Sequence, residues 1–192
     1  VLAPILIDEQ LLVEFILDNQ GHTFSLLEGG HAVACISGEP EPMRGCSASL
    51  LGVMRYRLVA SPAFVQRWFP AGITRATAQV APLMVFDRKD AMQSSFLLTQ
   101  FGLPDGAYPF HYVPSSDAFA EAVRLGLGYG MLPHEQCAAL LQTGALVDLT
   151  PAIAHDVPLY WHAWRIQPPR LERMGAALLK AASKALLPLA PP

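Results

Sequence analysis

Charged residues are scarce in this sequence, and the scarcity limits what the chain can bind by electrostatic attraction. Only 15% of the 192 residues are Asp, Glu, Lys or Arg, and the formal net charge at pH 7 is −3. Proteins that bind nucleic acid use a surplus of Lys and Arg to neutralise phosphates, and this chain has no such surplus. We therefore expect the chain alone to bind nucleic acid poorly.

Cysteine is also rare, and its distribution excludes the usual cysteine-based sites. Cys35, Cys46 and Cys137 are scattered without CxxC spacing, and each lies in or beside an apolar run. An odd, scattered set predicts reduced, packed thiols. Cys137 is surrounded by Ala and Leu in an expected helix, a context that raises the pKa of a thiol and argues against a nucleophile.

Other signatures of catalysis and metal binding are missing. No serine lies in a GxSxG motif, and none of the six histidines has metal-ligand spacing to another His, Cys or carboxylate. The chain is therefore expected to be neither an enzyme nor the holder of a cofactor or metal.

Long hydrophobic runs are absent as well. None reaches the roughly 20 residues that a membrane-spanning helix needs. The stretch 1–17 contains a proline and three acidic residues and has no basic start, so it does not resemble a signal peptide. These features indicate a soluble, cytoplasmic chain without a membrane partner, although a mature secreted protein stripped of its leader would look the same.

Hydrophobic residues are nevertheless abundant, at 52%, and their spacing alternates between strand-like and helix-like. The sequence predicts strands at 11–17, 32–37, 48–61, 82–86, 111–113, 129–132, 147–149 and 157–166, helices at 1–8, 22–30, 62–69, 91–101, 134–141 and 170–187, a turn at 19–21, and a connector at 71–80. A further helix is expected to end near Gly126. Alternation of this kind predicts an α/β layer fold.

The order of these elements predicts two lobes. The middle third contains a self-sufficient β-α-β-α-β-α series, whereas the first third lacks a covering helix that the last helix can supply. We expect residues 1–60 with 158–192 to form lobe I and residues 61–157 to form lobe II.

The stretch Pro109–Glu135 shows a complete strand, helix and strand. Pro114 ends the first strand, and Ser115, Ser116 and Asp117 are residue types that cap a helix N-terminus. Their simplest role is capping. The same donors suit a carboxylate or phosphate, because open α/β sheets bind ligands at the carboxyl ends of their strands.

Three further polar residues follow expected strands. Asp87 and Asp90 come after the strand at 82–86, and the segment 90–93 (DAMQ) fits a capping box with Gln93 at its third helical position. The alternative is that these carboxylates face a cleft between the lobes and pair with a cation. Ser37 ends the strand at 32–37, where it is either a solvated loop residue or a second hydroxyl near that cleft.

Several motifs resemble one known family. They are RLVASPAFVQRWFPAGIT at 57–74, VFDRKDAM at 85–92, PSSDAF at 114–119, GMLPHEQ at 130–136, LVDLTP at 146–151 and LYWHAW at 159–164. Together they resemble the effector-binding domain of LysR-type transcriptional regulators, in the subgroup described as arginine- and lysine-responsive regulators or inhibitors of chromosome initiation.

The resemblance implies a two-lobed fold like that of type 2 periplasmic binding proteins, with two hinge crossover strands and a small effector held between the lobes. It implies that the effector is Lys or Arg, that Asp87 and Asp90 supply negative charge, and that Ser115 and Ser116 receive its carboxylate or line the pocket. Ser37 and Met131 complete the expected effector-binding set.

The resemblance also implies partners for the chain. The domain is expected to form a homodimer, or a tetramer in the full-length regulator, and to reach DNA only through an N-terminal winged helix-turn-helix that this chain lacks. The first strand of lobe I is expected to be missing too. Position 93 is Gln, where the subgroup is expected to have His. The alternative function is a solute-binding protein of an amino-acid transporter.

Overall fold

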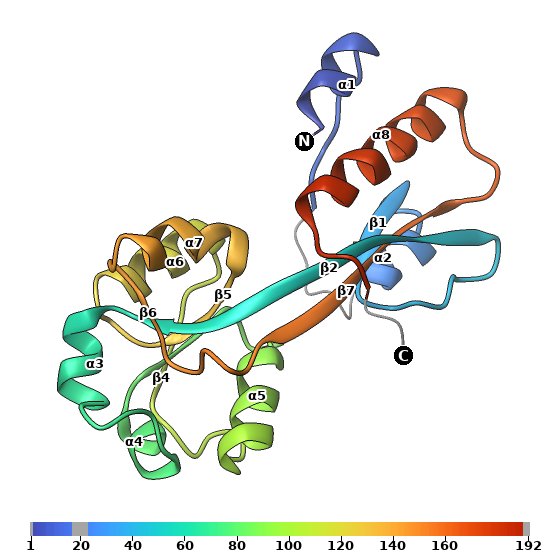
Figure 1. Ribbon diagram of the computed structural model, residues 1–192. Helices are drawn as coiled ribbons and strands as arrows, with labels where there is room; N and C mark the ends of the chain where they lie inside the picture. The colour runs from blue at the N-terminus through green and yellow to red at the C-terminus, as the bar shows by residue number, and fades with distance from the viewer. Residues whose placement is uncertain (1, 17–22, 190–192) are drawn as a thin grey trace. The chain divides into compact units, whose positions relative to one another are not determined.

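The computed structural model describes residues 2–16 and 23–189, which form two compact units. Unit 1 comprises Val1–Met54 with Asp156–Pro192, and unit 2 comprises Arg55–His155. Two long strands, β2 (Cys46–Ala60) and β7 (His155–Trp164), continue from one unit into the other (Figure 1). The fold is of the expected α/β type. The lobe boundaries expected from the sequence stay a prediction.

Unit 1 is a sheet covered by the C-terminal helix. Strand β1 (Ala34–Ser37) pairs antiparallel with β7, which lies between β1 and β2. Helix α8 (Pro169–Ala185) places Leu178 and Ala182 against the strand residues Leu51 and Leu159, as expected of a covering helix. The shorter helices of this unit are α1 (Ala3–Asp8) and α2 (Thr23–Glu28).

Unit 2 surrounds its strands with five helices of the described chain. Strands β5 (Gly130–Pro133) and β6 (Val147–Asp148) pair antiparallel with β2, whereas β3 (Leu83–Val85) and β4 (Phe110–Tyr112) pair parallel with each other. The helices are α3 (Pro62–Trp68), α4 (Arg75–Val80), α5 (Met92–Phe101), α6 (Ser116–Arg124) and α7 (His134–Gln142).

The centre of unit 2 is an aromatic cluster around Tyr129. The Tyr129 ring is fully buried and meets Phe69 edge to face, with 5.2 Å between ring centroids, and Phe64 at 6.1 Å. Its hydroxyl donates to the Ala78 carbonyl at 3.3 Å. This residue therefore joins strand β5 to the α3–α4 side of the unit.

The strand predicted at 11–17 is wrong for the described residues 11–16, which form neither strand nor helix. The side chain of Leu12 is fully exposed, and that of Phe15 is 70% exposed. An apolar run becomes a strand only when a neighbour takes up its backbone hydrogen bonds. Residue 17 and the turn predicted at 19–21 lie outside the described residues.

The connector predicted at 71–80 is also wrong, because α4 occupies its second half. Thr74 caps this helix: its hydroxyl accepts from Thr77 N at 3.3 Å, and the Thr77 hydroxyl accepts from Thr74 N at 2.8 Å. The reciprocal pair satisfies two N–H groups that a six-residue helix would otherwise leave without partners.

We expect Thr74→Ala to lower the free energy of unfolding by about 1 kcal/mol, because the substitution removes the N-cap acceptor of a short helix. Urea denaturation followed by circular dichroism measures this change. Thr143→Ala is the control, since that hydroxyl bonds only to carbonyls of the preceding helical turn. Equal losses in the two variants would contradict a capping role for Thr74.

The cysteine prediction is confirmed. Cys35, Cys46 and Cys137 are reduced thiols outside any disulfide, and all three are buried. Burial raises the pKa of Cys137 to about 11, as its apolar surroundings predicted. At neutral pH this thiol is protonated and packs as a small apolar side chain.

Two features are absent from the described part of the chain. None of its helices combines the length and apolar character needed to cross a membrane. No three His, Cys, Asp or Glu side chains of residues 2–16 and 23–189 are grouped so that they could hold a metal ion.

Candidate functional site

Two strand ends of unit 2 bring the predicted polar residues to one edge. Strands β3 and β4 run parallel, with Val85 opposite Tyr112, so their carboxyl ends point the same way. Asp87 follows β3, and Ser115 follows β4. Helix α6 begins directly after Ser115, and α5 begins at Met92, after the short loop that contains Asp87. Open α/β sheets bind ligands at strand ends of this kind.

The two aspartates hold the loop between β3 and α5 through backbone hydrogen bonds. Asp87 Oδ1 accepts from Lys89 N at 2.7 Å and from Asp90 N at 3.0 Å. Asp90 uses both oxygens: Oδ2 accepts from Phe86 N at 3.1 Å, and Oδ1 accepts from Met92 N at 3.0 Å. Both oxygens of Asp90 therefore hold the loop in place. Asp87 holds it through Oδ1, and its Oδ2 takes no part in these two bonds.

The capping predicted for segment 90–93 is half present: Asp90 Oδ1 accepts from Met92 N at the start of α5, but Gln93 does not complete a capping box. The N-cap of α5 is Ala91, and Gln93 is only 4% exposed because it faces the interior of unit 2. There Gln93 Oε1 accepts from Met131 N at 3.0 Å. A buried N–H on β5 needs an acceptor, and the Gln93 amide provides it instead of turning back to its own helix.

Met131, one of the predicted effector-binding residues, is 3% exposed in the core of unit 2. Its backbone bond to Gln93 links β5 to the first turn of α5. The sequence gives no clear signal of this link, because α5 also contains Ser94, Ser95, Thr99 and a second amide, Gln100. Direct contact between Met131 and a ligand stays a prediction.

The serines at the start of α6 are placed differently from ordinary caps. Ser115 is the N-cap residue, but its side chain makes no capping hydrogen bond, and both Ser115 and Ser116 are exposed. The Ser116 carbonyl accepts from Gln136 Nε2 at 3.2 Å, which ties the first turn of α6 to α7. The hydroxyls therefore stand beside the helix N-terminus, where partial positive charge favours an anion.

Ser37 belongs to unit 1, whereas the five other predicted residues belong to unit 2. It lies at the end of β1, is fully buried, and its Oγ accepts from Glu39 N at 3.1 Å. The solvated loop position that the sequence suggested is therefore wrong. A role of Ser37 in binding stays a prediction.

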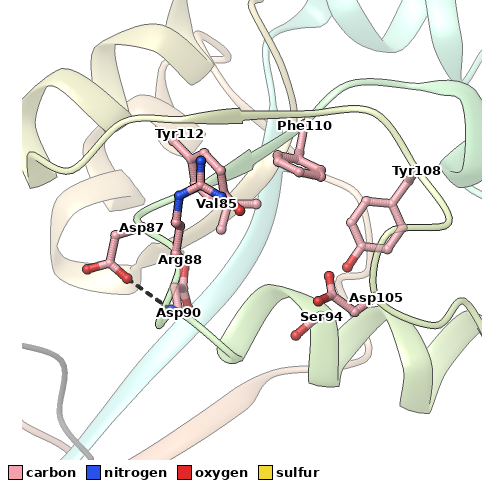
Figure 2. Close-up of a pocket in the computed structure, with 9 residues that line it drawn as sticks. All are labelled: Val85, Asp87, Arg88, Asp90, Ser94, Asp105, Tyr108, Phe110 and Tyr112. Carbon is pink, nitrogen blue, oxygen red and sulfur yellow. Dashed lines mark hydrogen bonds between the residues drawn. The ribbon is translucent and has the colours of Figure 1, made fainter. Parts of the chain in front are cut away.

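A small pocket adjoins the Asp87–Asp90 loop on the side of β4, with a volume of about 40 Å³. Three acidic residues are among those that line it, Asp87, Asp90 and Asp105 (Figure 2). Its other walls include the aromatic rings of Tyr108, Phe110 and Tyr112, the side chain of Ser94, and Arg88. The pocket is thus predominantly acidic and aromatic.

Sequence reasoning found only two of these pocket residues, Asp87 and Asp90. Asp105 precedes Gly106 in what reads as an ordinary turn, and it does bond there, with its Oδ1 accepting from Gly106 N at 3.0 Å. Tyr108 lies in the same loop without a periodic neighbour. Nothing in a linear pattern shows that this loop folds back beside α5 and β4.

Comparison with known proteins assigns the chain to a family. Residues 9–183 match the family described as LysR substrate binding domain. The chain is 38% identical over 187 residues to the HTH-type transcriptional regulator ArgP of Aeromonas salmonicida and 36% identical over 185 residues to that of Cronobacter sakazakii. These matches cover 97% and 96% of the chain but only 62% of each relative.

Solved structures agree with these matches. The C-terminal domains of a LysR family protein from Agrobacterium tumefaciens superpose with a TM-score of 0.90 at 35% identity, covering 98% of this chain and 92% of that one. Full-length LysG from Corynebacterium glutamicum, solved with bound effector Arg, superposes with a TM-score of 0.88 at 31% identity, covering 97% of this chain and 64% of LysG. The predicted type 2 periplasmic-binding-protein-like fold is thereby confirmed.

Proposed function

Because the chain belongs to the LysR substrate binding domain family, we propose that it is the effector-sensing part of a transcriptional regulator and that its effector is arginine or lysine. The observation that carries this proposal is its likeness, over nearly the whole chain, to a regulator solved with bound Arg. Units 1 and 2 are taken as the two lobes of this sensor.

The site in unit 2 supports a zwitterionic ligand with a cationic side chain. Such a ligand needs an anion-binding group for its carboxylate and negative charge for its side chain. The start of α6 with Ser115 and Ser116 offers the first, and Asp87 in the neighbouring loop offers the second. Asp90 adds negative charge while it holds the loop in shape.

DNA binding and assembly are proposed for the full regulator. The relatives are named HTH-type regulators, and the chain spans 62% of their length, so we place DNA contacts outside the matched part. A homodimer, and a tetramer of the full-length protein, is the proposed assembly. The site of action is the cytoplasm, where a regulator meets its operator. Effector binding changes transcription only if it favours one conformation over another.

Isothermal titration calorimetry of the 192-residue chain with L-arginine and L-lysine tests the proposed effector. We expect saturable binding of at least one of them and none of L-glutamate, whose side chain carries the opposite charge. Circular dichroism establishes that the sample is folded. Heats equal to those of buffer for both basic amino acids at millimolar concentration would refute the proposal.

A further inference from the structure

One buried hydroxyl of the acidic pocket has no hydrogen-bond partner in the described protein. Tyr108 is only 6% exposed, and its Oη is buried and unsatisfied. Figure 2 shows this hydroxyl pointing into the pocket beside the Asp105 carboxylate. A buried hydroxyl without a partner is costly, so its place at a pocket wall indicates that a ligand completes its bonding.

The charge of the pocket indicates what kind of ligand that is. Asp87, Asp90 and Asp105 contribute three negative charges against the single positive charge of Arg88. Burial, with added effects of Asp105 and Asp90, raises the pKa of Tyr108 to about 12, so the hydroxyl is neutral at pH 7 and both accepts and donates. A cationic N–H donor satisfies the carboxylates and the hydroxyl together.

The aromatic wall already holds one cation. The Arg88 guanidinium carbon lies 5.2 Å from the centre of the Tyr112 ring, and Phe110 packs against Tyr112 with ring centroids 5.0 Å apart. Both rings are 41% exposed at this wall. Arg88 thus shows that the Tyr112 face accepts a guanidinium, and its positive charge opposes the entry of a second one.

The size of the pocket sets how much of a ligand it takes. A volume of about 40 Å³ has room for roughly three water-sized groups and not for a whole amino acid. We propose that the pocket is the subsite for the cationic head group of the effector side chain, with Asp105 and Tyr108 as specificity-determining residues. This inference rests on the proposed function and adds to it the place of the ammonium or guanidinium group.

Binding of L-arginine and of its neutral analogue L-citrulline to matched variants tests the subsite. Asp105→Asn keeps an oxygen for Gly106 N but loses the charge, and we expect arginine affinity to fall on the order of 5-fold, as for a partly exposed ion pair, with citrulline affinity unchanged. Tyr108→Phe keeps the ring and should also weaken arginine. Glu135→Gln, an exposed carboxylate of α7 outside the pocket, is the control and should change neither ligand.

Arg88→Gln gives a readout that a purely structural role would not produce. Removal of the competing guanidinium should raise arginine affinity about 2- to 5-fold, because the pocket becomes more negative. An unchanged or lower affinity would contradict the charge balance that the proposal requires.

Failure of the subsite is distinguishable from failure of the proposed function. If the wild type binds arginine but Asp105→Asn alters arginine and citrulline equally, the subsite is refuted while amino-acid sensing stands. If the wild type binds neither arginine nor lysine, titration with methylguanidinium followed by NMR still tests the pocket. Amide shifts at Asp105 and Tyr108 that disappear in Asp105→Asn support a cation site, and no shift at either residue overturns it.

Discussion

Tyr129→Ala should lower the free energy of unfolding by about 3–5 kcal/mol, the range for removing a large aromatic side chain from a core. The ring is fully buried and contacts Phe64 and Phe69, which lie on α3 and just after it. Removing the ring leaves a cavity at the point where β5 meets these residues. The loss is large compared with the total stability of a domain, so we expect the variant to be partly unfolded at 37 °C.

Tyr129→Phe is the matched variant, because it keeps the ring and removes only the bond to the Ala78 carbonyl. We expect it to cost about 1 kcal/mol, the usual value for one neutral hydrogen bond. Urea denaturation monitored by tryptophan fluorescence measures both variants. A loss for Tyr129→Phe as large as for Tyr129→Ala would show that the hydrogen bond, and not ring packing, dominates at this position.

The sequence predicted most of the elements around the site because their signals are local. Pro62 begins α3 and Gly102 ends α5 in a left-handed conformation, and both are residue types with strong positional preferences. The strand-end rule also placed Asp87 and Ser115 at the ends of neighbouring strands, which the parallel pairing of β3 with β4 confirms. Whether these residues bind an effector stays a prediction.

Elements that depend on distant partners were not predictable in this way. The run 11–16 has the composition of a strand, but it pairs with no strand among the described residues. Its composition therefore predicted a strand that does not form. The Thr74–Thr77 capping box was not predictable from the usual sequence motif, because Thr and not Glu or Gln occupies the third helical position.

The missed parts of the site have the same origin. Gln93 fits a capping box in sequence, but the rotation of α5 turns it inward to Met131, and that rotation is set by packing. Tyr108 and Asp105 join the pocket only because the loop after α5 folds back beside β4. Tertiary structure, more than local propensity, decides which polar side chains meet.

Asp87→Asn should weaken the binding of arginine roughly 10-fold while leaving the fold intact. The asparagine side chain keeps an oxygen that can accept from Lys89 N and Asp90 N, so the loop retains its two hydrogen bonds. Only the negative charge is lost. A hydrogen bond to a charged group contributes about 1.5–3 kcal/mol. Asp87 is partly exposed, so we expect the lower end of this range, which corresponds to the roughly 10-fold loss.

The comparison ligand is L-citrulline, and calorimetry with both ligands separates charge from shape. If Asp87 acts through charge, citrulline binding should be nearly unaffected by the substitution, whereas equal losses for both ligands would argue for a steric role. Asp90→Asn is the contrasting variant, because an amide has one oxygen and cannot serve both Phe86 N and Met92 N. It should therefore lower stability as well as affinity, and urea denaturation of the two variants distinguishes a charge that serves the ligand from one that also holds the loop.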